Sequence, residues 1–295
     1  MKKPGTRLAL LVVALGLAAG CGGGGEVRVM AAGDLVCEPD EEQTETLCDQ
    51  KQVSDLVVDA DPVAFLALGD LCYSEASAEC FAESYEATYG RVRAKTIPAP
   101  GNHEYTDDPG DYFSYFGALA GDPERGYYSK DVGAWHVVAL NSNCDAVGGC
   151  EAGGPQERWL RDDLAADDAR CTLAIWHHPL FSSGEHGSQD EMRAMWEALM
   201  DDGAELVLQG HDHDYERFDP LDADGNPDPA GLRSFVVGTG GRSHYELEER
   251  LPGSVVGNDE TYGVLELTLR PAGYDWRFVP VPGGTLRDSG SAECR

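Results

Sequence analysis

The chain has 295 residues, of which 42% are hydrophobic, enough for one large α/β domain or two smaller ones with a sizeable core. Its formal net charge is −31, and basic residues cluster only at the N-terminal tip. This acidity disfavours nucleic-acid binding through a basic patch, and any site for an anionic substrate needs strong local positive charge.

The N-terminal segment has the pattern of an export signal. Three basic residues precede an apolar stretch over residues 8–19, which is shorter than the roughly 20 residues that a membrane span needs. The run LAAGC, ending at Cys21, resembles the bacterial lipoprotein signal, in which the cysteine is lipidated. An ordinary secretory signal with an incidental cysteine is the alternative. We expect a signal peptide over 1–21 and a glycine tether over 22–25, and therefore a bacterial cell-surface lipoprotein or a secreted protein.

Apolar runs predict the secondary structure of residues 26–295, which no composition shift or long linker divides. Strands are expected over residues 27–32, 63–68, 96–100, 127–130, 135–140, 171–176, 206–208, 234–237, 263–269 and 276–281. Helices are expected over residues 53–59, 78–89, 156–165 and 188–200, the last with Ser188 near its N-cap. A turn-rich loop is expected over 219–231. The order predicts one domain in which strands alternate with helices early and antiparallel strands follow late.

The cysteines favour disulfides. Eight remain after Cys21, an even number, and none lies in a C-x-x-C pair, so a zinc ribbon is disfavoured. In an exported protein disulfides are the default state of such cysteines. Sequence proximity, with the last pair assigned by elimination, suggests the pairs 37–48, 72–80, 144–150 and 171–294. Eight cysteines allow 105 connectivities, so this pairing is one hypothesis among many.

Five predicted strands end in a residue that can bind a metal ion. These residues are Asp34, Asp70, Asn102, His177 and His211. Because ligands of open α/β sheets bind beyond the carboxyl ends of the strands, we expect these side chains to gather there. Six of the eight histidines lie in or beside these strand ends. The other two, His136 and His244, are expected to have structural roles.

The stretch 204–217, AELVLQGHDHDYER, is the most informative of these strand ends. His211 and His213 follow its short apolar run two residues apart, so strand geometry can point both imidazoles to one side. Such a pair suits zinc or iron, or two metal ions roughly 3.5–4 Å apart. Solvated histidines in a polar loop are the alternative for this stretch taken alone.

Five short motifs resemble those of the calcineurin-like metallophosphoesterases, in the order of that family and over nearly the whole of residues 26–295. They are GDLVC (33–37), GDLCY (69–73), GNHE (101–104), HHP (177–179) and GHDH (210–213). Many members carry Asp-x-His in the first motif, whereas Val36 stands at the histidine position here and cannot bind a metal. Tyr73, three residues after Asp70, gives G-D-x-x-Y and resembles the purple acid phosphatases. A phenolate there favours a ferric ion, and an ordinary buried tyrosine is the alternative.

This resemblance implies a four-layer α/β/β/α sandwich of two mixed sheets, formed by a single catalytic domain over residues 26–295. The additional N-terminal β-sandwich domain of large plant-type purple acid phosphatases is expected to be absent. Two metal ions are implied, Fe³⁺ together with a divalent ion (Fe, Zn or Mn). The implied ligands are Asp34, Tyr73 and His213 for the first ion, Asn102, His177 and His211 for the second, and Asp70 as the bridge.

The resemblance also implies catalytic and substrate-binding residues. His103 and His186, the latter nine residues past His177, are expected to bind phosphoryl oxygens together with Asn102, or to protonate the leaving alkoxide. Loop histidines without a partner are the alternative for both. Glu104 is a candidate for orienting His103. His178 precedes a proline and is left out of the metal set.

The implied activity is that of a metal-dependent phosphoric ester hydrolase of the acid phosphatase type. It would cleave phosphate monoesters by in-line attack of a metal-bound hydroxide. One alternative is a phosphodiesterase or nucleotidase on the same centre. Another is a non-catalytic surface lipoprotein that binds metal or phosphate. The expected partner is a small-molecule phosphoester, with membrane contact only through a lipid anchor at Cys21.

Overall fold

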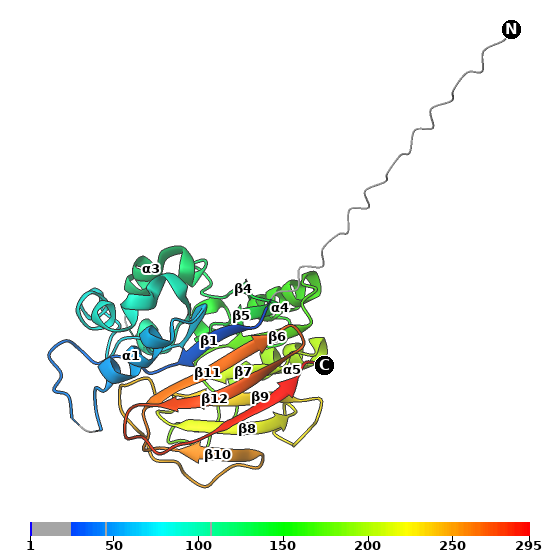
Figure 1. Cartoon of the computed structure of the whole chain (residues 1–295). Coiled ribbons are helices and arrows are strands. Elements are labelled where there is room, and N and C mark those ends of the chain that lie inside the picture. The colour runs from blue at the N-terminus through cyan, green and yellow to red at the C-terminus, as the bar shows by residue number, and fades with distance from the viewer. Residues whose placement is uncertain (2–24, 45, 107) are drawn as a thin grey trace.

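The computed structural model describes residues 1, 25–44, 46–106 and 108–295. The predicted signal peptide beyond Met1, and the tether before Gly25, lie outside the described residues. Within the described ranges, every helix is too short or too polar to cross a membrane. The strands in these ranges form one six-stranded and one seven-stranded sheet (Figure 1).

The six-stranded sheet has the order β13-β12-β11-β1-β2-β3. Its strands are β1 (Val27–Ala32), β2 (Ala64–Leu68), β3 (Thr96–Ala99), β11 (Gly263–Arg270), β12 (Gly273–Pro280) and β13 (Ser289–Glu293). β1, β2 and β3 run parallel, β11 pairs antiparallel with β1, and β12 and β13 each pair antiparallel with the strand before them. The sheet is therefore mixed, with its parallel half early in the chain.

The seven-stranded sheet has the order β10-β8-β9-β7-β6-β5-β4. Its strands are β4 (Tyr128–Val132), β5 (Trp135–Ala139), β6 (Cys171–Ile175), β7 (Leu206–Gln209), β8 (Tyr215–Leu221), β9 (Leu232–Val237) and β10 (Ser254–Asn258). β5, β6, β7 and β9 run parallel, whereas β4, β8 and β10 pair antiparallel with their neighbours. This sheet is also mixed.

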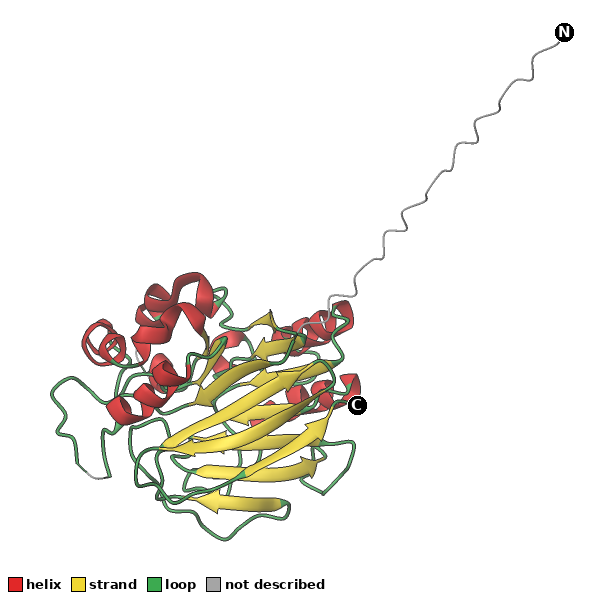
Figure 2. Cartoon of the chain, viewed as in Figure 1, coloured by secondary structure: helices red, strands yellow, loops and turns green. Residues whose placement is uncertain are grey.

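Helices flank the two sheets (Figure 2). The α-helices are α1 (Gln50–Ala60), α2 (Ala78–Cys80), α3 (Gly110–Phe116), α4 (Pro155–Ala166) and α5 (Arg193–Asp202). A π-helical turn, η1 (Phe81–Tyr85), continues α2. The 3₁₀ turns are η2 (Tyr89–Lys95), η3 (His103–Tyr105), η4 (Gly117–Ala120), η5 (Cys144–Val147) and η6 (Asp190–Met192).

Alternation along the strands produces two hydrophobic cores. In β5, Val137 packs into the core shared by the two sheets, whereas its neighbour Val138 packs on the opposite face, because successive strand side chains point to opposite faces. Leu160 of α4 and Trp196 of α5 cover that second face. Val53 of α1 packs against the first core, beside β11. The predicted four-layer α/β/β/α sandwich of two mixed sheets is confirmed.

Some predicted elements differ from those observed. The helix expected over 78–89 is divided into α2, η1 and the start of η2. Ser188 does not cap a helix, because its Oγ accepts from the Ser182 amide at 3.2 Å and α5 begins only at Arg193. β8 extends to Leu221, into the expected loop. Helix α3 and strands β8, β10 and β13 were not predicted, since their short or polar stretches lack a clear apolar period.

All four predicted disulfides are confirmed. The bonds join Cys37 to Cys48, Cys72 to Cys80, Cys144 to Cys150 and Cys171 to Cys294. Three of them close loops of 6 to 11 residues, whereas the fourth joins positions 123 residues apart. Four disulfides are typical of extracellular or exported proteins.

The long-range disulfide is expected to stabilise the fold most. Replacing Cys171 and Cys294 together with alanine should lower the free energy of unfolding by up to about 5 kcal/mol, since the bond restricts a large loop of the unfolded chain. The matched double variant of Cys144 and Cys150 should lose only about 2 kcal/mol, because its loop is short. Urea denaturation under non-reducing conditions measures both. An equal or larger loss in the short-loop variant contradicts this expectation.

Candidate metal centre

The fold brings all seven predicted ligands to one place. β1, β2 and β3 of one sheet and β6 and β7 of the other end there, and each is followed by one of the polar residues that the sequence singled out. Tyr73 and His213 come from the loops that continue two of these strand ends. The side chains form two groups, each described below.

The first group surrounds the Tyr73 hydroxyl. This oxygen lies 2.7 Å from Asp34 Oδ1, 2.9 Å from Asp70 Oδ2 and 2.9 Å from His213 Nε2. All four side chains are buried. A phenol carries one hydrogen and can donate to only one of the two carboxylates, so a positive charge is needed to offset their burial. A donor set of two carboxylates, a phenol and an imidazole fits a metal ion.

The second group surrounds His177 Nε2. It lies 3.1 Å from Asn102 Oδ1, 3.2 Å from His211 Nδ1 and 3.2 Å from Asp70 Oδ2. The other ring nitrogen of His177 donates to the Leu68 carbonyl at 2.9 Å, which leaves the Nε2 lone pair for a metal. One oxygen, Asp70 Oδ2, therefore belongs to both groups.

The backbone is in a rarely populated conformation at three of these positions. The φ angles are 60° at Asp34, 50° at Asp70 and 76° at His211, in the left-handed region that residues with a Cβ seldom adopt. Such strain concentrates at functional sites. Glycine is required at positions 69 and 101 because side chains of the site approach the backbone closely there. A Cβ added at Gly101 would lie 2.2 Å from Asp70 Oδ1, and one at Gly69 2.5 Å from His177 Nδ1.

Burial and neighbouring charges set the protonation of the site. Burial lowers the pKa of His177, but the Asp70 carboxylate more than offsets burial and raises the pKa to about 9. Burial, together with His177, lowers the pKa of His211, so that ring stays neutral. Burial, Asp34 and Asp70 raise the pKa of the Tyr73 phenol well above its ordinary value. A metal ion must therefore displace protons from His177 and Tyr73 in order to bind.

Metal binding at this centre is expected to strengthen with pH. Below about pH 9 the His177 ring is protonated, and that proton must leave before Nε2 can bind a metal. The apparent association constant for Zn²⁺ should therefore rise by about tenfold or more per pH unit between pH 6.5 and 9. Competition titrations against a chelating dye, corrected for its own titration, measure this slope. A flat profile over this range contradicts the expectation.

Glu104 has a different role from the one that the sequence suggested. Its carboxylate does not orient His103. It accepts from the backbone amides of Asp70 at 2.9 Å, Leu71 at 2.8 Å and Gly101 at 2.6 Å, and is itself buried. Glu104 therefore ties the loop after β2 to the loop after β3, which sets the position of Asp70.

Residues that the sequence analysis missed support the ligands from a distant loop. Ser243 Oγ lies 2.7 Å from His213 Nδ1, which directs the other nitrogen of that ring toward Tyr73. The Tyr245 ring stacks on the His213 ring, with their centroids 3.9 Å apart. No motif marks these positions, and only the proximity of the loop after β9 could have identified them.

The two predicted catalytic histidines lie beside different groups, His103 next to Tyr73 and His186 next to His211. His103 Nδ1 is 2.5 Å from the Ser74 carbonyl. Because a carbonyl oxygen only accepts, Nδ1 carries the proton of this hydrogen bond. The other ring nitrogen, Nε2, lies 3.8 Å from Asp70 Oδ2. His186 is exposed, and its ring stacks on His211 with centroids 4.5 Å apart. Both imidazoles are near the candidate ligands, and the His103 side chain is partly exposed as well.

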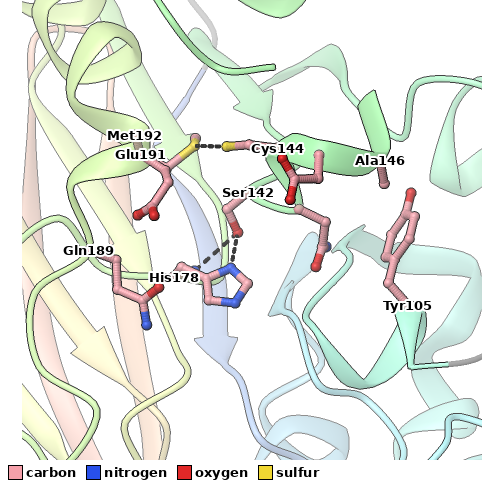
Figure 3. A pocket seen from close by; sticks show the side chains of 10 residues that line it. Tyr105, Ser142, Cys144, Ala146, His178, Gln189, Glu191 and Met192 are labelled. Carbon is pink, nitrogen blue, oxygen red and sulfur yellow. Dashed lines mark hydrogen bonds between the residues drawn. The ribbon is translucent and has the colours of Figure 1, made fainter. Parts of the chain in front are cut away.

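A cavity of about 430 Å³ opens beside the second group (Figure 3). His178 and Gln189 line it and also face the centre. The His178 ring centroid lies 4.6 Å from that of His211, and the amide nitrogen of Gln189 lies 3.0 Å from His211 Nε2. Ser142 Oγ lies 2.7 Å from His178 Nδ1. Burial and His177 lower the pKa of His178 to about 3, so His178 presents a neutral ring to the cavity.

Comparison with known proteins agrees with this geometry. Residues 27–215 match the family described as calcineurin-like phosphoesterase. The chain belongs to this family. Purple acid phosphatase 21 of Arabidopsis thaliana is 30% identical over 199 residues, which cover 60% of this chain and 43% of that protein. Purple acid phosphatase 22 of the same plant is 35% identical over 121 residues, which cover 39% and 27%. The chain thus lies in the branch that resembles the purple acid phosphatases.

A solved structure shows the same fold. The purple acid phosphatase PPD1 from yellow lupin seeds matches with a TM-score of 0.70 over 91% of this chain and 54% of that chain, at 21% identity. The chain spans less than half the length of the two Arabidopsis phosphatases that it matches. What those whole proteins act on therefore enters only as a proposal.

Proposed function

We propose that this protein is a binuclear-metal phosphohydrolase that cleaves phosphate monoesters. The observation that carries the proposal is the shared oxygen, since Asp70 Oδ2 lies 2.9 Å from the Tyr73 hydroxyl and 3.2 Å from His177 Nε2. One carboxylate oxygen common to two sets of ligands is the arrangement needed to hold two ions close together. The family and its purple acid phosphatase relatives support the same activity.

The two ions would differ. The first group contributes two carboxylates and a phenolate, hard anionic ligands that favour Fe³⁺. Asn102, His177 and His211 offer neutral oxygen and nitrogen ligands, which suit Fe²⁺, Zn²⁺ or Mn²⁺. Ions bound there would activate water for attack on phosphorus and neutralise phosphoryl charge. They also supply the local positive charge that an acidic protein needs in order to attract a phosphoester.

The side chains around the ligands would position the substrate. The amide of Asn102 would donate to phosphoryl oxygens. His103 would do so from Nε2 in its imidazolium form, since Nδ1 is occupied by the Ser74 carbonyl. His186, exposed above His211, would protonate the leaving alkoxide. The cavity beside His178 would hold the leaving group, since it opens next to the second group of ligands. Its polar rim, which includes Asp145 and Glu191, favours a polar alcohol over a long alkyl chain.

The test is hydrolysis by the purified chain. An aryl phosphate monoester and the matching diester are compared across pH, with and without prior chelation. Chelator-sensitive preference for the monoester is the expected result. Preference for the diester would retain the centre but overturn the monoester assignment. No hydrolysis of either ester with two metals bound per chain would overturn the enzyme proposal in favour of a binding protein.

The chain organisation follows as part of the same proposal. We propose that residues 26–295 form the catalytic domain, that residues 1–21 are the export signal with a lipid on Cys21, and that residues 22–25 are a tether. Four disulfides support passage through an oxidising compartment. The intact mass of the mature protein from bacterial membranes tests the anchor. An unmodified mature N-terminus beyond Cys21 would overturn it.

A further inference from the structure

A second cluster of metal-binding side chains surrounds His136 in β5. The His136 side chain is 6% exposed, and its Nε2 lies 2.8 Å from Asp163 Oδ2. Its Nδ1 lies 3.3 Å from Asp131 Oδ1 and 3.3 Å from Asp167 Oδ2. Asp131 is the partner of His136 in the β4–β5 hairpin, Asp163 is in α4, and Asp167 follows the last residue of that helix.

This cluster is separate from the candidate metal centre. His136 pairs with Thr172, near the start of β6, whereas His177 follows the end of the same strand. Five residues of extended chain separate these two levels by about 16 Å. The two sites therefore cannot share an ion.

The imidazole is surrounded by acceptors. A neutral ring has one N–H and one lone pair, and the buried Nε2 is placed to donate its hydrogen to Asp163. The Nδ1 lone pair then faces two carboxylate oxygens, so the arrangement needs either a second proton on the ring or a metal ion between these atoms. In the described part of the chain, no lysine or arginine pairs with Asp131, Asp163 or Asp167, whose ion pairs there are all with His136.

The distances at Nδ1 favour a metal ion over a shared proton. A direct charge-assisted N–H···O bond is about 2.7–2.9 Å long, shorter than either Nδ1 contact. Ligand bonds of about 2.0–2.1 Å at tetrahedral angles place two ligand atoms about 3.3 Å apart. Both Nδ1-to-carboxylate distances have that value.

The surrounding protein holds two of the carboxylates in place. Asp167 Oδ1 accepts from the Ala169 amide at 2.7 Å, which leaves Oδ2 directed at the imidazole. Asp163 Oδ1 accepts from Ser129 Oγ at 2.7 Å, and its other oxygen meets His136 Nε2. A carboxylate behind a histidine is the usual partner of a metal-bound imidazole, because it orients the ring and makes it more basic. The C-terminal end of α4 also favours a cation.

We propose that His136, Asp131 and Asp167 bind a divalent cation of the zinc type, with Asp163 positioning the imidazole. The ion clamps the β4–β5 hairpin to the C-terminal end of α4. Asp131 is largely exposed, so solvent can reach the ion and complete its coordination. The site has no part in the proposed hydrolysis and does not depend on it.

The test is Zn²⁺ binding by the full chain after removal of metals with a chelator. Wild type should bind one more equivalent of Zn²⁺ than Asp131→Asn or Asp167→Asn, or bind that equivalent at least about tenfold more tightly. Asp163→Asn should weaken it by about 10–100-fold. Asp168→Asn, an exposed neighbour outside the cluster, is the matched control and should bind as wild type does.

Added Zn²⁺ should raise the melting temperature of wild type more than that of Asp167→Asn. Circular dichroism checks that each variant is folded, and aspartate-to-asparagine changes keep the side-chain size. Equal Zn²⁺ stoichiometry and affinity in Asp131→Asn, Asp167→Asn and the control would overturn the proposal. His136 would then be a protonated imidazole held by three carboxylates. This proposal stands even if the chain hydrolyses no ester, provided that Asp167→Asn binds one Zn²⁺ equivalent fewer than wild type.

Discussion

Asp70→Asn is expected to lower kcat/KM for phosphate monoesters by about a thousandfold or more and to release metal from both groups of ligands. The oxygen Oδ2 of Asp70 is the one atom shared by the Tyr73 and His177 groups. An amide in its place removes one negative charge from the centre and offers a weaker ligand to both ions. A thousandfold fall in kcat/KM corresponds to losing several kcal/mol of the transition-state stabilisation that the metal ions would supply.

The measurement pairs steady-state kinetics with metal analysis of the same preparations. Asp59→Asn, on the exposed end of α1, is the matched control and should keep both metal and activity. Circular dichroism establishes that the Asp70 variant is folded. An Asp70→Asn protein that retains two metals and more than a tenth of wild-type activity contradicts the bridging role.

His186→Gln should lower kcat for alkyl phosphates by about 10²–10⁴-fold while leaving the metal content unchanged. His186 is exposed and stacks on the His211 ring, near the predicted second ion but outside the ligand set. Glutamine can still donate a hydrogen bond, but it cannot transfer a proton to a leaving alkoxide. Esters of acidic phenols need little protonation, so their turnover should fall by less than about tenfold.

A series of phosphate monoesters with leaving groups of increasing pKa measures this selectivity. Glu185→Gln, the exposed neighbour, is the control and should follow the wild-type line. An equal loss on good and poor leaving groups would remove His186 from the role of acid. A loss of metal would show instead that its ring mainly supports His211.

The predicted site residues were within reach of sequence analysis because their chemistry is local. Gly69-Asp70 and Gly101-Asn102 each combine a strand end, a glycine that permits close approach and a polar ligand within a few residues. Parallel strands place their carboxyl ends at one edge, so motifs far apart in the chain were expected to meet. The three short-range disulfides follow the same logic, since nearby cysteines are easily joined.

Contacts between distant segments were not predictable in this way. No residue near Glu104 in the sequence indicates what its carboxylate contacts. In the structure it accepts hydrogen bonds from the amides of a loop more than 30 residues away. Ser243 and Tyr245 support His213 from a loop that no pattern connects with it. The sequence marked His136 only as a histidine outside the motifs, and its three carboxylates are brought to it by the hairpin and α4.

By itself, therefore, the sequence determined which residue types can bind metal, which strands they end, and the family to which the chain belongs. The tertiary structure decided that one oxygen of Asp70 is shared, which groups hold the ligands in place, and that His136 faces three acids. The physical reason is the distance along the chain over which each effect acts. Propensity, glycine geometry and ligand chemistry act over a few residues, whereas the approach of two sheets depends on packing over the whole chain.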